Sequence, residues 1–179
     1  PGNEIICVDE LTDGAACTVL LARDMIDNQH PLMIANCDQF IDIKIDDYLA
    51  AFDTKAFDGM IMTMRATDKR WSFVRLDHRR NVSELREKEV ISNEATVGIY
   101  NFSKGSDFVF AANSMIAKNI RTNGEFYVAP VYNELISAGK KIAIFNIGEL
   151  GNGMHGLGTP SDLNAFLKST TAAKLIRKN

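Results

Sequence analysis

The chain has 179 residues, 46% of them hydrophobic and 24% charged, which is typical of one globular domain with a substantial core. This balance excludes a disordered chain, a collagen-like repeat and a coiled coil. Lysine and arginine number 20 against 23 aspartates and glutamates, a net charge of -3 without a strongly basic stretch, so a nucleic-acid-binding groove is not expected. No apolar run approaches the ~20 residues that a membrane-spanning helix needs.

The cysteines indicate a reducing compartment. Cys7, Cys17 and Cys37 each lie in an apolar segment, and none of them forms a CxxC pair. This pattern predicts buried, unpaired thiols in a cytoplasmic protein. The three histidines have no zinc-site spacing with the cysteines, so a structural zinc ion is not expected.

The first half of the chain alternates short apolar runs with helical patterns, as an α/β domain does. The predicted elements are strands at 4–8, 31–35 and 58–64 and a short helix at 46–53. A longer helix begins after Thr12 or Asp13, either of which can cap it, and continues to about residue 27. Its core, AACTVLLA, is apolar nearly all round, so we expect this helix to be buried.

The second half begins with a half-exposed hairpin, whose predicted strands at 72–76 and 82–86 flank a turn. A β-rich run follows at 95–102, and the next helix begins at Ser106 with an apolar stripe. The remaining predicted elements are a helix near 130–138, a strand at 141–146 and a final helix that opens with Pro160 at its first position. No repeat or linker interrupts residues 1–179, so we predict a single domain.

Asp38 is the sharpest candidate for chemistry. It follows the apolar strand at 31–35, and a carboxylate there lies at the carboxyl edge of the sheet, where open α/β sheets bind ligands. One carboxylate, together with substrate phosphates and water, is how Mg²⁺ is usually held. The alternative is that Asp38 forms an Asx turn after the strand.

Three further segments offer binding chemistry. In Glu87-Lys88 the lysine can bind a phosphate while the acid receives sugar hydroxyls, although such a charge run is also typical of a solvated surface. Residues 151–156 spell GxGxxG, but too few residues follow for the second half of a βαβ unit, so a dinucleotide site is not expected; the loop either lets a ligand approach its backbone or is a flexible lid. At 13–16, DGAA opens a helix whose amides can face an anion or a base edge, or it is a plain helix cap.

The order of several short motifs is more informative than any one of them. The motifs are DGAA at 13–16, LMIANCD at 32–38, the run from WSFVRL (71–76) through LREK (85–88) and SN (92–93) to VGIY (97–100), NGEFY at 123–127 and GTPSDL at 158–163. In this order they resemble the sugar-1-phosphate nucleotidylyltransferases, or NDP-sugar pyrophosphorylases. The resemblance is greatest to a bacterial subgroup associated with surface-polysaccharide synthesis.

The resemblance implies a Rossmann-like, three-layer nucleotide-diphospho-sugar transferase fold with a mostly parallel mixed sheet. It also implies Mg²⁺-dependent transfer of a nucleotidyl group from a nucleoside triphosphate to a sugar 1-phosphate, which gives an NDP-sugar for polysaccharide synthesis and pyrophosphate. By position, Asp38 would bind the Mg²⁺ and Lys88 the sugar phosphate. Substrate binding would also involve Gly14 at the base, Glu87 at the sugar hydroxyls, Gly98 near the sugar, and Ser72. We therefore expect Asp38 and Lys88 to line one cleft at the carboxyl edge of the sheet.

Three departures from the family pattern bear on function. The family's first strand, its GxGxR loop and the following lysine do not occur, so the chain is expected to be a fragment that lacks the first strand–helix units and is inactive alone. The family's second metal-binding aspartate aligns with Gly156, and His155, Glu149 and Asp162 are candidates to replace it. The family's base-reading glutamine is Asp9 here; because a carboxylate only accepts hydrogen bonds, it would favour cytosine or guanine over uracil, unless Asp9 faces solvent.

Two other functions stay open. One is a metal-dependent glycosyltransferase of GT-A-like fold, in which Asp38 would be the acidic metal motif. The other is a non-catalytic nucleotide-sugar-binding domain, which the departures favour, whereas Glu87-Lys88 and the GTP at 158–160 favour the nucleotidylyltransferase. The expected partners are a nucleoside triphosphate and a sugar 1-phosphate, without nucleic acid or membrane. The sequence leaves open the sugar, the base and whether the chain forms a homo-oligomer.

Overall fold

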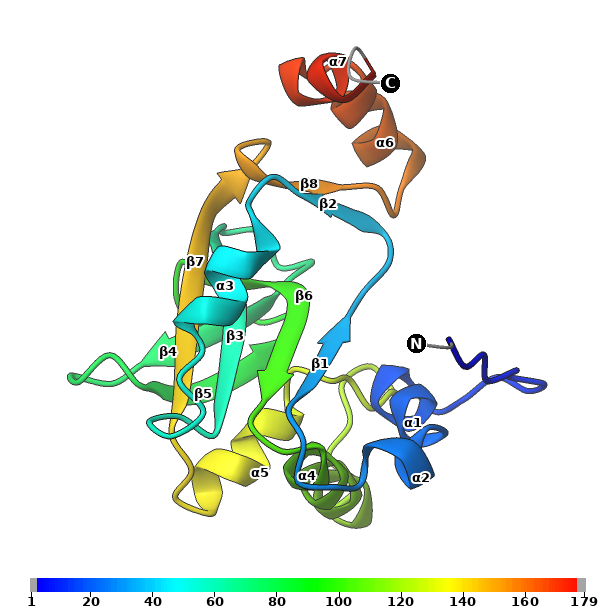
Figure 1. Cartoon of the computed structure of the whole chain (residues 1–179), viewed down its shortest axis with the longest axis vertical. Coiled ribbons are helices and arrows are strands. Elements are labelled where there is room, and N and C mark those ends of the chain that lie inside the picture. The colour runs from blue at the N-terminus through cyan, green and yellow to red at the C-terminus, as the bar shows by residue number, and fades with distance from the viewer. Residues whose placement is uncertain (1–2, 177–179) are drawn as a thin grey trace.

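The structure is a computed structural model, which describes residues 3–176. An eight-stranded sheet forms its centre (Figure 1). The strands are β1 (Leu32–Ala35), β2 (Gln39–Ile41), β3 (Gly59–Arg65), β4 (Ser72–Leu76), β5 (Val82–Glu87), β6 (Glu94–Phe102), β7 (Ile142–Leu150) and β8 (Gly153–Gly156). The helices are α1 (Ala15–Leu20), α2 (Arg23–Ile26), α3 (Ile45–Ala51), α4 (Gly105–Ala117), α5 (Val131–Ser137), α6 (Pro160–Leu167) and α7 (Thr170–Ile176).

The sheet is mixed and mostly antiparallel. Its strand order is β2-β8-β7-β3-β6-β4-β5, and β1 also pairs with β6. Among the described strands, the β3–β7 and β7–β8 pairs are parallel and the other pairs are antiparallel. The α/β class is confirmed, but the predicted mostly parallel sheet is wrong. Strands β3 to β6 follow one another without a helix, and a parallel neighbour needs a crossover of a dozen or more residues.

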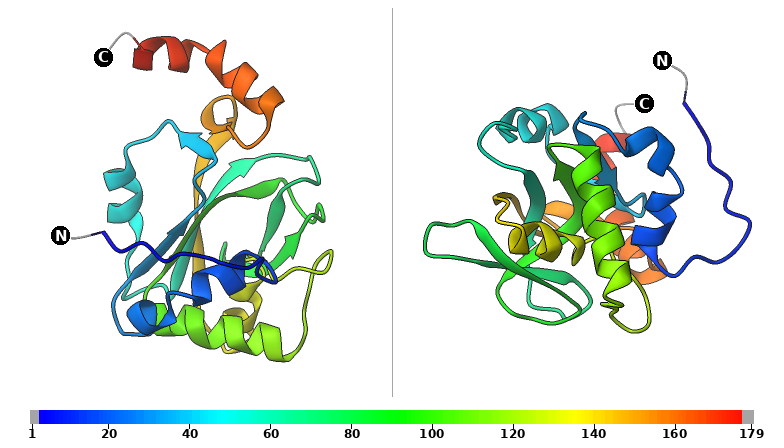
Figure 2. Two further views of the ribbon diagram at one scale, coloured as in Figure 1. Left: turned by 90° about the vertical axis from the view of Figure 1, so that its right-hand side faces the viewer. Right: turned by 90° about the horizontal axis from the view of Figure 1, so that it is seen from below.

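The sheet separates two hydrophobic cores. On one face it packs against α1, α4 and α5, where the rings of Phe102 and Tyr132 stack with centroids 4.5 Å apart. Helix α3 covers the other face through buried Tyr48, whose hydroxyl donates to the Asn101 side chain at 3.0 Å. In Figure 2, α4 lies below the sheet in the left view and in front of it in the right view, which looks at the molecule from below. Neighbouring residues of β3 alternate between the two cores, as in strands buried on both faces.

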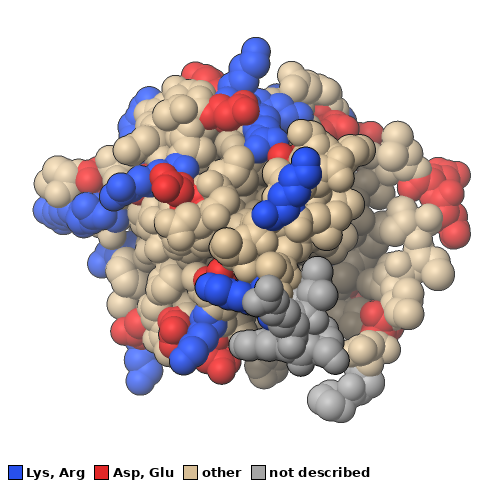
Figure 3. Space-filling model, turned by 90° about the horizontal axis from the view of Figure 1, so that it is seen from above, with Lys and Arg blue, Asp and Glu red and all other residues tan. Residues whose placement is uncertain are grey.

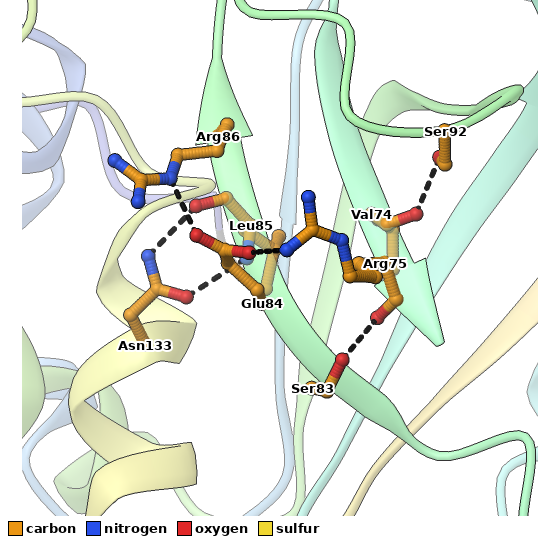
Figure 4. Close-up of polar contacts among 8 residues, drawn as sticks. All are labelled: Val74, Arg75, Ser83, Glu84, Leu85, Arg86, Ser92 and Asn133. Carbon is orange, nitrogen blue, oxygen red and sulfur yellow. Dashed lines mark hydrogen bonds and ion pairs between the residues drawn. The ribbon is translucent and has the colours of Figure 1, made fainter. Parts of the chain in front are cut away.

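The edge strand β5 is held by α5 and by charged side chains. Asn133 of α5 accepts a hydrogen bond from the Leu85 amide and donates one to the Leu85 carbonyl, both at 2.8 Å (Figure 4). On the same strand Glu84 forms ion pairs with Arg75 and Arg86. The Asn133 hydrogen bonds occupy backbone groups that another strand could otherwise pair with, and together with the ion pairs they hold the hairpin whose open end reaches the cleft described below.

The N-terminal predictions are wrong. The predicted strand at 4–8 is an exposed segment that pairs with no described strand, and Ile5 is 86% exposed. The predicted buried helix over 13–27 is two short helices, α1 and α2, in which Ala16 alone is buried. Its N-cap is Gly14 rather than Thr12 or Asp13. An apolar run forms a strand only where a partner supplies hydrogen bonds, and the described chain offers none beside residues 4–8.

The cysteines are only partly as predicted. Cys7, Cys17 and Cys37 are free, but Cys7 and Cys37 are exposed, so the predicted burial is wrong for these two. Cys7 lies in the unpaired N-terminal segment, and Cys37 lies in the short loop between β1 and β2. Burial raises the pKa of the half-buried Cys17 thiol.

The last two helices extend beyond one end of the sheet (Figure 1). Helix α6 begins as predicted, with Pro160 in its first turn and Thr159 Oγ1 accepting a hydrogen bond from the Asp162 amide at 3.1 Å. Phe166 attaches this helix to the sheet by packing against the rings of Phe40 and His155, at 5.3 and 5.2 Å. None of the helices described is long and apolar enough to cross a membrane.

Candidate active site

A cleft of about 380 Å³ opens where β1 and β4 separate along β6. Because β3 occupies one edge of β6, β1 and β4 must share the other edge. Strand β1 pairs with residues 99–102 of β6 and β4 with Ala95, so residues 96–98 lie between the two pairings and line the cleft. The open end of the β4–β5 hairpin, the segment before α5 and the β8–α6 connection form the other walls.

Gly98 creates the bend at the centre of this cleft. Its φ is 76°, and a Cβ there would lie 2.5 Å from Nδ2 of Asn36. Its carbonyl accepts a hydrogen bond from the Asn36 amide at 2.9 Å, where β1 leaves the sheet. The β3–β6 register shifts at the same place, as it does at a β-bulge. Any other residue at this position would be strained and would collide with Asn36.

Ser72 and Glu87 are cross-strand partners at the open end of the hairpin, and both line the cleft. The buried Ser72 hydroxyl donates a hydrogen bond to the Glu87 carboxylate. Burial raises the pKa of Glu87 above its ordinary value, while the Ser72 hydrogen bond and the Lys88 charge oppose this rise. A carboxylate has about four acceptor positions, so Glu87 can also receive hydroxyl groups of a ligand.

Lys88 follows Glu87 and points its ammonium group toward Tyr127. Its Nζ donates to the Tyr127 hydroxyl at 2.6 Å and lies 4.7 Å from the centre of that ring. The hydrogen bond raises the pKa of Lys88, so the ammonium is charged at neutral pH. The φ of Lys88 is 56°, a conformation that costs a non-glycine residue about 1 kcal/mol and that is common at functional sites. Two N–H donors of the ammonium are left for a ligand.

The floor of the cleft contains two buried hydroxyl groups. Thr96 and Tyr100 share a hydrogen bond of 3.0 Å. Burial raises the pKa of Tyr100 to about 12, with a smaller contribution from the charge of Glu87. Tyr100 is therefore neutral at physiological pH, and the floor provides neutral hydrogen-bonding groups beneath the charged Glu87 and Lys88.

Asp38 lines the opposite side of the same cleft. Its side chain is exposed and takes part in no hydrogen bond or ion pair with any residue of the described chain. The carboxylate lies beside Gly158, where a Cβ would be 2.5 Å from Oδ2. Within residues 3–176 no three His, Cys, Asp or Glu side chains are grouped to hold a metal by themselves. A single unpaired carboxylate at a polar cleft fits Mg²⁺, which takes its other ligands from phosphates and water.

Asp162 brings a second carboxylate to this side. It lies at the start of α6, and its carboxyl group is 3.4–3.5 Å from the place that a Cβ of Gly156 would occupy. The hydrogen bond from Thr159 and the charge of Arg70 lower the pKa of Asp162. Of the three candidates to replace an acid at Gly156, only Asp162 lines the cleft; His155 and Glu149 do not.

Two predicted site residues lie outside the cleft. Asp9 is exposed in the N-terminal segment, and Gly14 precedes α1. A Cβ at Gly14 would be 2.6 Å from the backbone of Phe126, so close packing already explains the glycine. The next residue, Ala15, does line the cleft. Asp38, Ser72, Glu87, Lys88 and Gly98 are the predicted site residues that the fold brings together.

The face of the molecule seen from above carries both signs of charge (Figure 3). On the face seen from above, lysines and arginines are interspersed with aspartates and glutamates (Figure 3). On this face, charge selectivity therefore depends on individual side chains more than on a field of one sign.

The sequence motifs did not single out three residues of the cleft. Arg70 directly precedes the WSFVRL run, Asn36 lies inside LMIANCD, and Tyr127 ends NGEFY. Each was therefore within or next to a recognised motif. The sequence offered no reason to choose these positions. Arg70 contacts Asp162, Asn36 contacts Gly98 and Tyr127 contacts Lys88, and each of these contacts joins residues far apart in the chain.

Comparison with known proteins gives consistent matches. Residues 3–143 match the model of a protein family described as nucleotidyl transferase. Among solved structures, a nucleoside-diphosphate-sugar pyrophosphorylase from Vibrio cholerae RC9 is 27% identical with a TM-score of 0.74, over 90% of this chain and 68% of that one. No curated protein sequence matches this chain.

Two more distant structures share the fold. A protein from Bacillus anthracis, assigned as a glucose-1-phosphate thymidylyltransferase and solved with sucrose, is 18% identical with a TM-score of 0.66, over 85% of this chain and 58% of that one. The inositol-1-phosphate CTP transferase from T. maritima is 14% identical with a TM-score of 0.62, over 86% of this chain and 59% of that one. The chain thus spans about 60–70% of the length of these three proteins.

Proposed function

The chain belongs to the nucleotidyl transferase family, and from this premise we propose that it transfers a nucleotidyl group from a nucleoside triphosphate to a sugar 1-phosphate. The observation that carries the proposal is the meeting of Asp38 and the Glu87-Lys88 pair in one cleft, although they are about 50 residues apart in sequence. A carboxylate that can bind Mg²⁺, an ammonium group with two unused N–H donors and a half-buried acid together suit a phosphorylated sugar better than a neutral ligand.

The reaction joins a phosphate oxygen of the sugar 1-phosphate to the α-phosphorus of the nucleotide and releases pyrophosphate. Such a transfer needs positioning and charge neutralisation more than covalent participation by the protein. Lys88 binds the sugar phosphate with the two N–H donors that Tyr127 leaves free, and so aligns the attacking oxygen. The strained conformation of Lys88 keeps its amide on the Trp71 carbonyl at 3.0 Å while the side chain reaches the cleft.

The sugar lies over the bend of β6 in this proposal. Glu87 accepts hydrogen bonds from sugar hydroxyls, and Ser72 orients the Glu87 carboxylate by donating to it. Because Gly98 has no side chain, space for the sugar is left at the bend of β6. The uncharged hydroxyl groups of Tyr100 and Thr96 lie at the bottom of this subsite.

Mg²⁺ is the cofactor that the site would hold. Asp38 is the residue that would ligate it, because its carboxylate is unpaired and faces the cleft. When bound, Mg²⁺ would neutralise phosphate charge and act as a Lewis acid. The role of the product in polysaccharide synthesis and the identity of the base remain predictions from the resemblance.

The test is a product assay with the natural full-length protein, which also serves for the turnover measurements below, together with Mg²⁺ and a panel of nucleoside triphosphates and sugar 1-phosphates. Pyrophosphate release and the mass of an NDP-sugar are measured together, with Asp38→Asn as the site variant and Asp42→Asn as a matched control outside the cleft. We expect both products from the wild type and the control, and neither above background from Asp38→Asn. Binding of an NDP-sugar without pyrophosphate release from any triphosphate would contradict the proposal and favour a glycosyltransferase or a binding domain.

A further inference from the structure

An ion pair between Arg70 and Asp162 crosses the cleft. Arg70 lies in the connection between β3 and β4, and Asp162 lies in the first turn of α6, 92 residues away. Nη1 of Arg70 donates to both carboxylate oxygens, at 3.2 and 3.1 Å. Both side chains line the same cleft as Asp38 and Lys88. The pair therefore connects two walls that local sequence does not join.

The guanidinium of Arg70 is held in one orientation, but not all of its N–H donors have a hydrogen-bond partner. It lies 4.6 Å from the centre of the Trp71 ring, and its Nε is 3.7 Å from Asp68. Among the described residues no partner binds Nη2. A planar guanidinium that stacks on an aromatic ring is prepared for bidentate binding of a planar or tetrahedral oxyanion.

Positive charge is scarce in the cleft. Arg70 and Lys88 are the cationic residues among its lining, against Asp38, Glu87 and Asp162. A cleft that receives two phosphate-bearing substrates needs more positive charge than Lys88 supplies. In the ligand-free arrangement the charge of Arg70 is balanced by Asp162.

We propose that Arg70 is a second phosphate-binding residue of this site and that Asp162 is its counter-ion in the absence of ligand, which a substrate phosphate replaces on the Arg70 guanidinium. This inference rests on the proposed function, because that function supplies the phosphates.

The exchange is physically easy. The side chain of Arg70 is 36% exposed and that of Asp162 is 20% exposed, and ion pairs in contact with water contribute little. A phosphate dianion offers Arg70 more charge and more acceptor oxygens than one carboxylate does. Asp162 keeps a partner after the exchange, because Thr159 Oγ1 donates to its carboxylate at 2.8 Å.

The fluorescence of a tryptophan in the chain can report phosphate binding at Arg70. Trp71 is the single tryptophan, and it lies beneath the guanidinium of Arg70. Its fluorescence, with calorimetry in parallel, measures the binding of inorganic phosphate, a sugar 1-phosphate and a nucleoside triphosphate in separate titrations. The variants are Arg70→Gln, Arg70→Lys and Asp162→Asn, with Lys69→Gln as a matched control that removes one positive charge outside the cleft.

We expect Arg70→Gln to weaken phosphate binding about tenfold, as the loss of one charge-assisted contact does, and Arg70→Lys to recover part of it. Asp162→Asn removes the competitor and should tighten binding about threefold. Lys69→Gln should change little. Arg70→Gln titrations with the sugar 1-phosphate and with the triphosphate identify which of them supplies the phosphate.

The proposal is overturned if Arg70→Gln and Lys69→Gln have equal effects, or if Asp162→Asn weakens binding as much as Arg70→Gln. These titrations measure phosphate binding, whereas the proposed function is tested by product formation. The two hypotheses can therefore fail independently. Phosphate binding through Arg70 without any NDP-sugar product would leave this inference intact and reject the function. Product formation with unchanged binding in Arg70→Gln would do the opposite.

Discussion

The two sides of the cleft are built differently. The hairpin wall, defined as Ser72, Glu87, Lys88, Thr96, Tyr100 and Tyr127, comes from long strands and the segment before α5. Each of its side chains has a hydrogen-bonded neighbour within the wall. The glycine wall, defined as Asp38, Gly156, Gly158, Thr159 and Asp162, comes from the ends of the short strands β1 and β8 and the start of α6.

This difference indicates which side chains of the site are already oriented in the absence of a ligand. The hairpin wall rests on a core that includes Phe73 and Val97, so its groups are oriented in advance. On the glycine wall Asp38 is unpaired, and Asp162 is bound by Thr159 within the wall and by Arg70 from across the cleft. We infer that the sugar-phosphate side is preorganised, whereas the carboxylate side obtains its final contacts from ligands.

The largest expected effect concerns stability beneath the two walls. Phe73→Ala removes a fully buried ring and should lower the free energy of unfolding by about 3–5 kcal/mol. Phe166→Ala removes a half-buried ring that attaches α6, and should cost about 1–2 kcal/mol because less apolar surface is lost. Denaturant unfolding followed by circular dichroism measures both. Equal losses would show that the glycine wall is as firmly packed as the hairpin wall.

The next effect concerns the chemistry of the hairpin wall. Lys88→Ala removes a charged donor and should lower kcat/KM for the sugar 1-phosphate about 100-fold, since a hydrogen bond to a charged group contributes about 1.5–3 kcal/mol. Tyr127→Phe leaves the ammonium but removes its 2.6 Å partner, so KM should rise about threefold with kcat nearly unchanged. Steady-state pyrophosphate release measures both, with Lys69→Ala as the charge-matched control. A large kcat loss in Tyr127→Phe would contradict a purely positioning role.

The pH dependence of stability should have opposite signs on the two walls. Burial raises the pKa of Glu87, so its ionised form opposes folding above that pKa. Glu87→Gln should therefore raise the melting temperature at pH 7, and the gain should vanish below the ordinary value of 4.5. The pKa of Asp162 is lowered, so its ionised form supports folding above 3.8, and this support is lost as pH falls through the lowered value.

Asp162→Asn should accordingly lower the melting temperature slightly at pH 7, and the difference from the wild type should shrink as the pH falls below 3.8 toward the lowered pKa of Asp162. Thermal unfolding from pH 3 to 8 measures both variants against the wild type. Shifts of the same sign in the two variants at pH 7 would contradict the contrast between the walls.

The smallest effect is expected at Asp9. The structure places this residue in the exposed N-terminal segment and outside the cleft, so the predicted base-reading role has no contact to support it. Asp9→Gln should change the ratio of CTP to UTP use by less than about threefold, the effect of an exposed hydrogen bond. A nucleotide scan of kcat/KM measures the ratio. A shift of tenfold or more toward UTP would show that Asp9 does read the base.

Much of the candidate site could be predicted from the sequence because its signals are local. The strand that ends before Asp38, the hairpin that ends at Glu87-Lys88 and the helix that opens at Pro160 each depend on residues close together in the chain. Strand alternation and helix capping act over such distances. The order of the motifs then indicated a nucleotidyltransferase, and the match of residues 3–143 to the nucleotidyl transferase family confirms the prediction at that level.

Tertiary structure decided the rest, because those features depend on partners distant in the chain. Residues 4–8 have the composition of a strand but no neighbouring strand, whereas the short β2 and β8 become strands by pairing with each other. The pairs formed among β3 to β6 are antiparallel, since the connections between these strands contain no helix. The positions of Tyr127 beside Lys88 and of Arg70 against Asp162 join residues 39 and 92 apart. Local propensity carries no information about such contacts, since only the packed sheet brings these side chains together.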